Sequence, residues 1–240
     1  MLYQSFHLPP ACAVNSTIYK KLFDENADLA KADKELIKDK VSKMIWRYCL
    51  KAETIHVPPY IDEVREYPEI EFLEVQLTCE GKLKRLAEIM MRTIPYPMVI
   101  FFRLQDKVQL WLAHQRINQS DPNKNTLEEF VTTEWIPEND PLFERLDIRT
   151  MRFTNCWTLY SDIVDAVSIY HAEKHVGTSK IFDGHSARKV MHELTLLESE
   201  IIKLRNALKK ETQFNRKLDM NMQIKKLEIK KSMLMQEQGQ

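Results

Sequence analysis

The stretch EIEFLEVQL, residues 69–77, decides the fold because it predicts a β-strand that is largely apolar on both faces. Successive side chains of a strand point to opposite faces, which gives two sets here: Ile70, Phe72, Glu74 and Gln76 on one, and Leu73, Val75 and Leu77 on the other. Such a strand is typical of a sheet covered on both sides. Glu74 and Gln76 therefore either line a site or are satisfied locally, with Arg103 as an available base.

The segments around this strand predict further strands and amphipathic helices. We expect strands at 43–50, 54–57, 98–104 and 107–115, strand-like alternation at 126–136, and helices at 14–29 (capped by Ser16 or Thr17), from 33, at 81–92 and from about 155. This order indicates an α/β fold of the α+β type, in which helices flank a mixed sheet.

The C-terminal part carries a heptad pattern with spacings of 4, 3, 4, 3 and 4. The apolar positions of this seam are Val190, Leu194, Leu197, Ile201, Leu204 and Leu208. We expect a globular domain at 1–178, a linker at 179–185 and a coiled-coil tail at 186–236. A weaker second run follows, so the tail is either a helical hairpin or one long helix that pairs with another chain.

Composition excludes several classes of protein. The 240 residues are 44% hydrophobic and 29% charged, which indicates a folded protein. The formal net charge is +0, so the protein as a whole has no positive charge that would attract nucleic acid. The four cysteines contain no C-x-x-C pair, which disfavours a zinc knuckle or a disulfide framework and favours a reducing cytoplasm. The sequence shows neither an export signal nor an apolar run long enough for a membrane span, so we expect no membrane partner.

One pattern of acidic and amide side chains is compatible with a nuclease. In the core shared by many restriction enzymes, an acidic residue precedes an acid-x-Lys or acid-x-Gln pair, and the carboxylates hold Mg²⁺. Asp62 followed by Glu74 and Gln76 fits this arrangement loosely, with Asp62 and Glu74 as metal ligands. Against it, the usual lysine is absent and Asp62 lies in a polar, loop-like run. We therefore favour a structural role in which Glu74 pairs with a base such as Arg103.

Two other motifs favour structural interpretations. The sequence HAEKH places His171 and His175 on one helical face, as a two-histidine metal site requires, but it offers no third ligand. Residues 184–240 hold twelve Lys or Arg against seven Asp or Glu, so the tail could bind nucleic acid through a basic face. Interleaved charges on a heptad helix are more typical of a solvated surface. No cofactor is expected, with Mg²⁺ needed only by a nuclease.

Several segments together carry a resemblance to a known family. They are Leu8-Pro9, Val14-Asn15 and Lys20 to Phe23 near the N-terminus, Ile45 to Leu50 with Thr54-Ile55, EIEFLEVQL, IPYPMVIFF, and KKETQFNRKLDMN in the tail. With these segments, the chain resembles a bacterial family of domain-of-unknown-function proteins encoded beside helicases and DNA methyltransferases in restriction-like, anti-phage defence loci.

The resemblance implies a role near DNA-processing machinery and no catalytic residues. We therefore expect a non-enzymatic accessory or adaptor subunit of a defence complex, whose seam at 190–208 docks a helicase or methyltransferase. Self-association through the tail and contact with nucleic acid, direct or indirect, stay open. The alternative is a divergent metal-dependent DNA nuclease that uses Asp62, Glu74 and Gln76.

Overall fold

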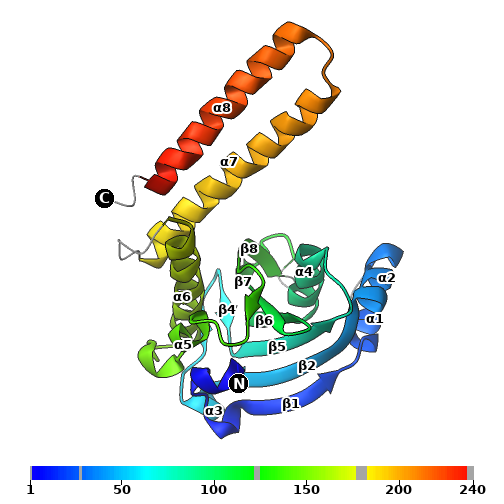
Figure 1. The fold of residues 1–240 in the computed structure, drawn as a ribbon. Helices are drawn as coiled ribbons and strands as arrows, with labels where there is room; N and C mark the ends of the chain where they lie inside the picture. The colour runs from blue at the N-terminus through cyan, green and yellow to red at the C-terminus, as the bar shows by residue number, and fades with distance from the viewer. Residues whose placement is uncertain (1, 27–28, 122–124, 177–182, 237–240) are drawn as a thin grey trace. The chain divides into compact units, whose positions relative to one another are not determined.

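The computed structural model describes residues 2–26, 29–121, 125–176 and 183–236 (Figure 1). The strands are β1 (Ala13–Ile18), β2 (Val41–Leu50), β3 (Tyr60–Ile61), β4 (Glu66–Tyr67), β5 (Ile70–Leu77), β6 (Met98–Leu104), β7 (Lys107–Ile117), β8 (Asn125–Thr132) and β9 (Ile136–Pro137). The α-helices are α1 (Lys21–Asn26), α2 (Lys31–Lys40), α3 (Ala52–Ile55), α4 (Leu83–Thr93), α5 (Leu142–Arg145), α6 (Cys156–Val176), α7 (Gly184–Lys210) and α8 (Phe214–Gln236). Short 3₁₀ helices are η1 (Leu2–Phe6), η2 (Pro10–Cys12) and η3 (Ile148–Thr150).

One mixed sheet organises the N-terminal part of the chain. Its strand order is β1-β2-β5-β6-β7-β8, and β9 pairs with β7. The pair β5 and β6 is parallel, because α4 carries the chain back across the sheet between them, and the other pairs are antiparallel. The expected mixed α/β architecture with flanking helices is therefore confirmed, with β5 in the interior of the sheet.

Both faces of β5 are covered, as its two apolar sets predict. Leu73, Val75 and Leu77 join a core with buried side chains of α1, α2 and α4. On the opposite face, Phe72 lies in an aromatic cluster, with its ring centroid 5.8 Å from that of Phe6 and 5.7 Å from that of Phe101. Glu74 shares this aromatic face, so the carboxylate stands in an otherwise apolar layer.

Two predicted local structures were wrong. Ser16 and Thr17 lie in β1 and do not cap a helix, because the β-branched run around them pairs with β2 and α1 begins only at Lys21. Residues 52–55 form one helical turn, α3, where a strand was expected at 54–57. Thr54 closes that turn, since its hydroxyl accepts a 2.9 Å hydrogen bond from the Lys51 amide and donates to the Cys49 carbonyl at 3.0 Å.

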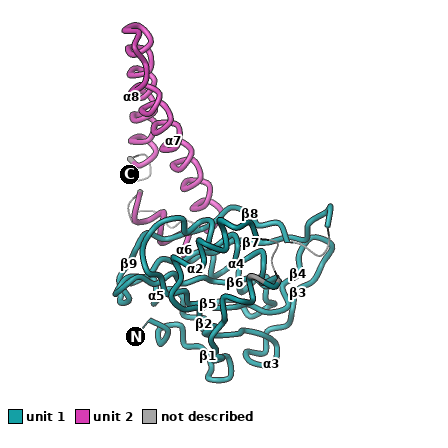
Figure 2. Tube along the Cα trace, turned by 90° about the vertical axis from the view of Figure 1, so that its right-hand side faces the viewer, with its two compact units in different colours: residues 1–166 teal, residues 167–240 magenta. Residues whose placement is uncertain are grey.

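The chain divides into two compact units, residues 1–166 and 167–240 (Figure 2). The division falls inside α6, whereas the sequence suggested a boundary near 178. The expected linker, 179–185, lies mostly outside the described residues, and Asp183 caps the start of α7 by accepting from the Ser186 amide at 2.8 Å. None of the helices in the described parts is both long and apolar enough to cross a membrane.

In the second unit, α7 and α8 form an antiparallel helical hairpin (Figure 1). Ion pairs cross between the helices, with Lys230 Nζ 3.0 Å from Glu193 Oε1 and Lys231 Nζ 2.6 Å from Glu198 Oε1. Of the two arrangements left open by the heptad pattern, the structure has the hairpin.

Candidate functional site

Glu74 is the centre of a buried polar network on the aromatic face of the sheet. Its side chain is 1% exposed. Oε2 accepts hydrogen bonds from Tyr3 Oη at 2.7 Å, Arg47 Nε at 3.0 Å and Arg47 Nη2 at 2.9 Å, while Oε1 accepts from Gln76 Nε2 at 2.9 Å. Arg103 Nη1 lies 3.6 Å from Oε2, so the expected pairing with Arg103 is present but secondary to Arg47.

A β-bulge in β2 places Arg47 in this network. The register passes from Trp46 opposite Leu73 to Tyr48 opposite Phe72, which leaves Arg47 as the extra residue. Arg47 and Tyr48 therefore both reach the face of Glu74, and the Arg47 guanidinium also lies over the Tyr3 ring, 5.3 Å from its centroid. Arg47 could not be predicted from the sequence, because its position depends on how β2 pairs with β5 and on the bulge in that pair. The residues of β2 alone do not show either feature.

The network keeps Glu74 ionised. Burial alone would raise the pKa of Glu74, but hydrogen bonds from Gln76 and Tyr3 and the charge of Arg47 outweigh burial and lower it. Burial and the Glu74 charge together raise the pKa of Tyr3, so Tyr3 stays a hydrogen-bond donor. Burial disfavours the charged form of Arg47, yet the Glu74 carboxylate raises its pKa. Glu74 is thus an anion whose charge is matched within the fold.

The structure brings Glu74 and Gln76 together but does not join Asp62 to them. Asp62 lies in the β3–β4 connection, where its carboxylate accepts from Tyr60 Oη at 2.7 Å and from the amides of Val64 and Arg65 at 2.8 and 2.6 Å. These hydrogen bonds lower the pKa of Asp62, and they close a turn. Among the described residues, Asp62 and Glu74 have no hydrogen-bond partner in common, so the three nuclease candidates belong to two separate local structures.

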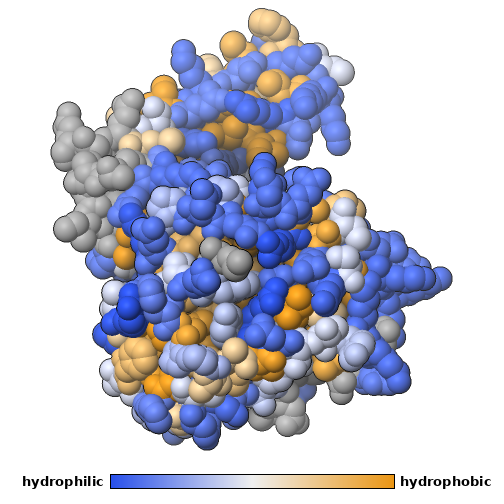
Figure 3. Space-filling view, turned by 60° about the horizontal axis from the view of Figure 1, so that its bottom comes forward, coloured by the Kyte–Doolittle hydropathy of each residue, from blue (hydrophilic) through white to orange (hydrophobic). Residues whose placement is uncertain are grey.

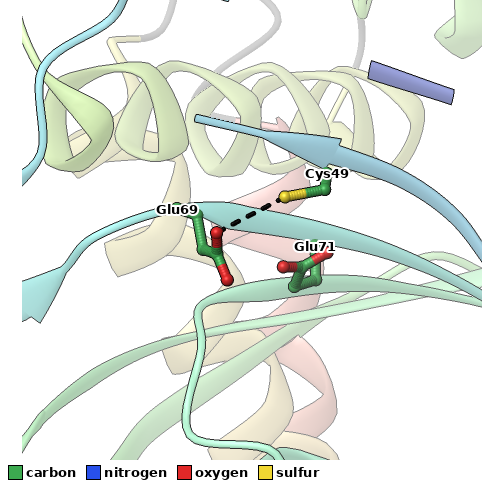
Figure 4. A group of neighbouring side chains, drawn as sticks. All are labelled: Cys49, Glu69 and Glu71. Carbon is green, nitrogen blue, oxygen red and sulfur yellow. Dashed lines mark hydrogen bonds between the residues drawn. The ribbon is translucent and has the colours of Figure 1, made fainter. Parts of the chain in front are cut away.

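A second group of acidic side chains lies on the opposite face of β5, where Cys49, Glu69 and Glu71 form what we call the acid–thiol cluster (Figure 4). One potential ligand atom from each residue lies within 4.8 Å of the others, and the Cys49 thiol donates to Glu69 Oε2 at 3.5 Å. Cys49 and Glu71 are buried and oppose each other across β2 and β5. Sequence reasoning missed this cluster because its three members come together only through that strand register.

The acid–thiol cluster is electrostatically unbalanced. Burial, with the charge of Glu69 added, raises the pKa of Glu71 to about 8, although the Trp46 hydrogen bond opposes the rise. Burial and the two neighbouring carboxylates also raise the pKa of the Cys49 thiol. Trp46 Nε1 donates to Glu71 Oε2, while Glu71 Oε1 has no hydrogen-bond partner in the described structure. Without a bound cation, the cluster therefore retains protons.

An apolar cavity of about 180 Å³ adjoins this cluster. Glu71 lines it together with Ile18, Leu22, Trp46, Leu73, Ile94, Tyr96 and Met98. The Glu71 side chain is therefore shared between the acid–thiol cluster and a small apolar space.

The histidine pair in the second unit is close enough for contact. Nε2 of His175 lies 2.9 Å from Nε2 of His171, so the helical spacing places both rings as the sequence predicts. Among the described residues, no third His, Cys, Asp or Glu lies close enough to the two histidines to complete a three-ligand metal site.

The predicted seam of the tail lies inside the hairpin unit. Val190, Leu194, Leu197 and Ile201 are buried, and Leu204 and Leu208 are half-buried. Val190 and Leu194 belong to a core cluster against which Leu234 of α8 packs. In this conformation the chain covers its own seam, so a partner could bind there only if the hairpin opened.

Comparison with known proteins supplies a family and no relative of known activity. No curated protein and no solved structure matches the chain. The family model described as "Domain of unknown function (DUF4391)" matches residues 6–230, nearly the whole sequence. The chain belongs to this family of domain-of-unknown-function proteins.

Proposed function

We propose that this protein is a non-enzymatic adaptor that docks a partner on the outer face of α8. The observation that carries the proposal is a second apolar stripe on α8, made of Leu218, Met222, Ile229 and Met233. Each of these side chains is between 50% and 53% exposed. We call this set the outer stripe.

Helical geometry supports the outer stripe as one surface. Its spacings of 4, 7 and 4 residues keep the four side chains within about 60° of the helix circumference. The inward-facing positions of α8, among them Ile224 and Leu227, lie on the opposite side of the helix. Apolar and hydrophilic side chains are both visible on the hairpin, at the top of the view in Figure 3. A helix that is apolar on two opposite faces is typical of one that packs against two neighbours.

Charge near the outer stripe supports a partner that carries acidic side chains. Lys225 and Lys226 flank the outer stripe midway along it, are exposed, and make no ion pair within the described residues. A partner helix with an apolar stripe bordered by Asp or Glu would match both features. Because the chain resembles defence-locus proteins, we propose a cytoplasmic helicase or DNA methyltransferase of the same complex as the first candidate to carry such a helix.

The test uses full-length protein and the purified neighbouring helicase or methyltransferase, with affinity measured by calorimetry. We expect Leu218→Gln/Ile229→Gln and Lys225→Glu/Lys226→Glu each to weaken binding at least tenfold. The matched controls are Leu196→Gln/Ile202→Gln and Lys209→Glu/Lys210→Glu, which change equally exposed residues of α7 and should leave the affinity unchanged.

Three results would overturn the proposal. The first is no binding to either neighbouring enzyme, and the second is binding that the α8 variants do not weaken. The third is a dimer in light scattering that only the α8 variants dissociate, which would assign the outer stripe to a second copy of this chain. Binding of DNA alone, falling steeply with salt and lost with the lysine variant, would favour a nucleic-acid module.

A further inference from the structure

We propose that the acid–thiol cluster is a Zn²⁺ site, with the Cys49 thiolate and one carboxylate oxygen each of Glu69 and Glu71 as protein ligands. Figure 4 shows the side chains of Cys49 on β2, of Glu69 just before β5 and of Glu71 on β5, which lie close together. This site is independent of the adaptor function, since the outer stripe belongs to α8.

The first argument is charge. Two carboxylates and a thiol gather where Cys49 is 5% and Glu71 is 4% exposed, and no Lys, Arg or His of the described chain forms an ion pair with either glutamate. Buried anions require a cation or protons. A divalent cation would supply the missing positive charge at the point where the three side chains converge.

The second argument is the orphaned oxygen of Glu71. Oε1 is buried without a hydrogen-bond partner in the described structure, whereas Oε2 is held by the Trp46 indole. Buried polar atoms in native proteins are almost always satisfied. A bound metal would satisfy Oε1, and the Trp46 hydrogen bond is the kind of outer contact that fixes a ligating carboxylate.

The identity of the metal follows from the donor set. Mg²⁺ and Ca²⁺ prefer oxygen ligands alone, and Cu⁺ prefers sulfur, whereas Zn²⁺ accepts thiolate and carboxylate together. Ligand atoms around tetrahedral zinc lie roughly 3.5 Å apart. The three atoms lie within 4.8 Å of one another, so small side-chain rotations bring them to that separation. Binding would release the thiol proton and any carboxyl proton to solvent.

Three protein ligands leave a fourth position for water. Glu71 also lines the apolar cavity of about 180 Å³, so this cavity adjoins one of the three proposed ligand residues.

The experiment is metal reconstitution of the full-length protein. Protein stripped with a chelator is titrated with Zn²⁺, and bound metal is measured by mass spectrometry after desalting. We expect one zinc per chain, and we expect Co²⁺ to give a thiolate-to-cobalt absorption band. Cys49→Ser should abolish that band and lower zinc affinity at least tenfold, and Glu69→Gln should lower the affinity similarly. Glu69 is only half-buried, so this second variant does not depend on a core substitution.

Cys79→Ser is the matched control, because Cys79 is an exposed cysteine of the same unit. It should retain both the zinc and the cobalt band. The proposal is overturned if the wild type binds no zinc, or if Cys49→Ser and Glu69→Gln bind zinc as well as wild type does. It is also overturned if the metal is lost only in His171→Ala/His175→Ala, which would assign the binding to the histidine pair.

Discussion

The Arg47 guanidinium donates two hydrogen bonds, from Nε at 3.0 Å and from Nη2 at 2.9 Å, to a single oxygen of Glu74. Both side chains are mostly or fully removed from solvent, at 25% and 1% exposure. Removal of one partner would leave a buried charge without its match, so the pair constrains any substitution at either position.

We expect Arg47→Met to lower the free energy of unfolding by roughly 3 kcal/mol, because the Glu74 charge would stay buried without its main cation. Arg47→Met/Glu74→Gln should recover most of that loss, since neither charge then remains. Urea unfolding measures both. Arg149→Met removes a side chain that is 62% exposed from its pair with Asp147, and it should lower the urea midpoint much less than Arg47→Met does. A double variant as unstable as Arg47→Met would contradict this view of the network.

Tyr3→Phe tests the third donor to Glu74. The hydroxyl donates at 2.7 Å to a buried anion, and we expect its removal to cost about 1.5–3 kcal/mol of unfolding free energy. The same urea titration measures the change. Tyr60→Phe removes a hydroxyl that donates to exposed Asp62, and it serves as the control with a smaller expected loss. Equal losses of unfolding free energy in the two variants would show that burial of Glu74 does not strengthen the hydrogen bond from Tyr3.

Acid should weaken the fold through Glu74. The pKa of Glu74 in the folded state lies below its ordinary value of 4.5, so its contribution is present above pH 4.5 and is lost as the pH falls through the folded-state pKa. Urea midpoints between pH 6 and pH 3 should therefore fall more steeply for the wild type than for Arg47→Met/Glu74→Gln. Parallel curves would mean that Glu74 titrates alike in the folded and unfolded chains.

The hairpin depends on the buried seam of α7. We expect Leu194→Ala to lower the free energy of unfolding of the helical unit by about 2–3 kcal/mol, because Leu194 is 4% exposed and packs in its core. Leu196→Ala, on the same helix but 56% exposed, should change it by no more than about 0.5 kcal/mol. Far-ultraviolet circular dichroism follows both transitions. If Leu194→Ala and Leu196→Ala destabilised the helical unit equally, the buried seam of α7 would not be what holds the hairpin together.

The nuclease alternative has a direct assay. We expect purified protein with Mg²⁺ or Mn²⁺ to leave plasmid DNA uncut, because Oε2 of Glu74 is bound by Tyr3 and Arg47 and Oε1 by Gln76. Cleavage that disappears in both Glu74→Ala and Asp62→Ala would restore the nuclease hypothesis. Cleavage that survives both substitutions would come from other residues or from a contaminant.

The sequence by itself determined the mixed α/β class, the burial of both faces of residues 70–77 and the helical tail, because periodicity records which side of an element is covered. The sequence pattern predicted the wrong local structure at residues 14–18 and 52–55. At 14–18 the chain pairs with β2 as a strand, and at 52–55 the Thr54 hydroxyl closes a helical turn. Tertiary structure alone decided that Arg47 meets Glu74, that Cys49 meets Glu71, and that the seam of α7 is covered by α8. Each of these contacts depends on register between segments distant in the chain, and register is set by packing of the whole domain.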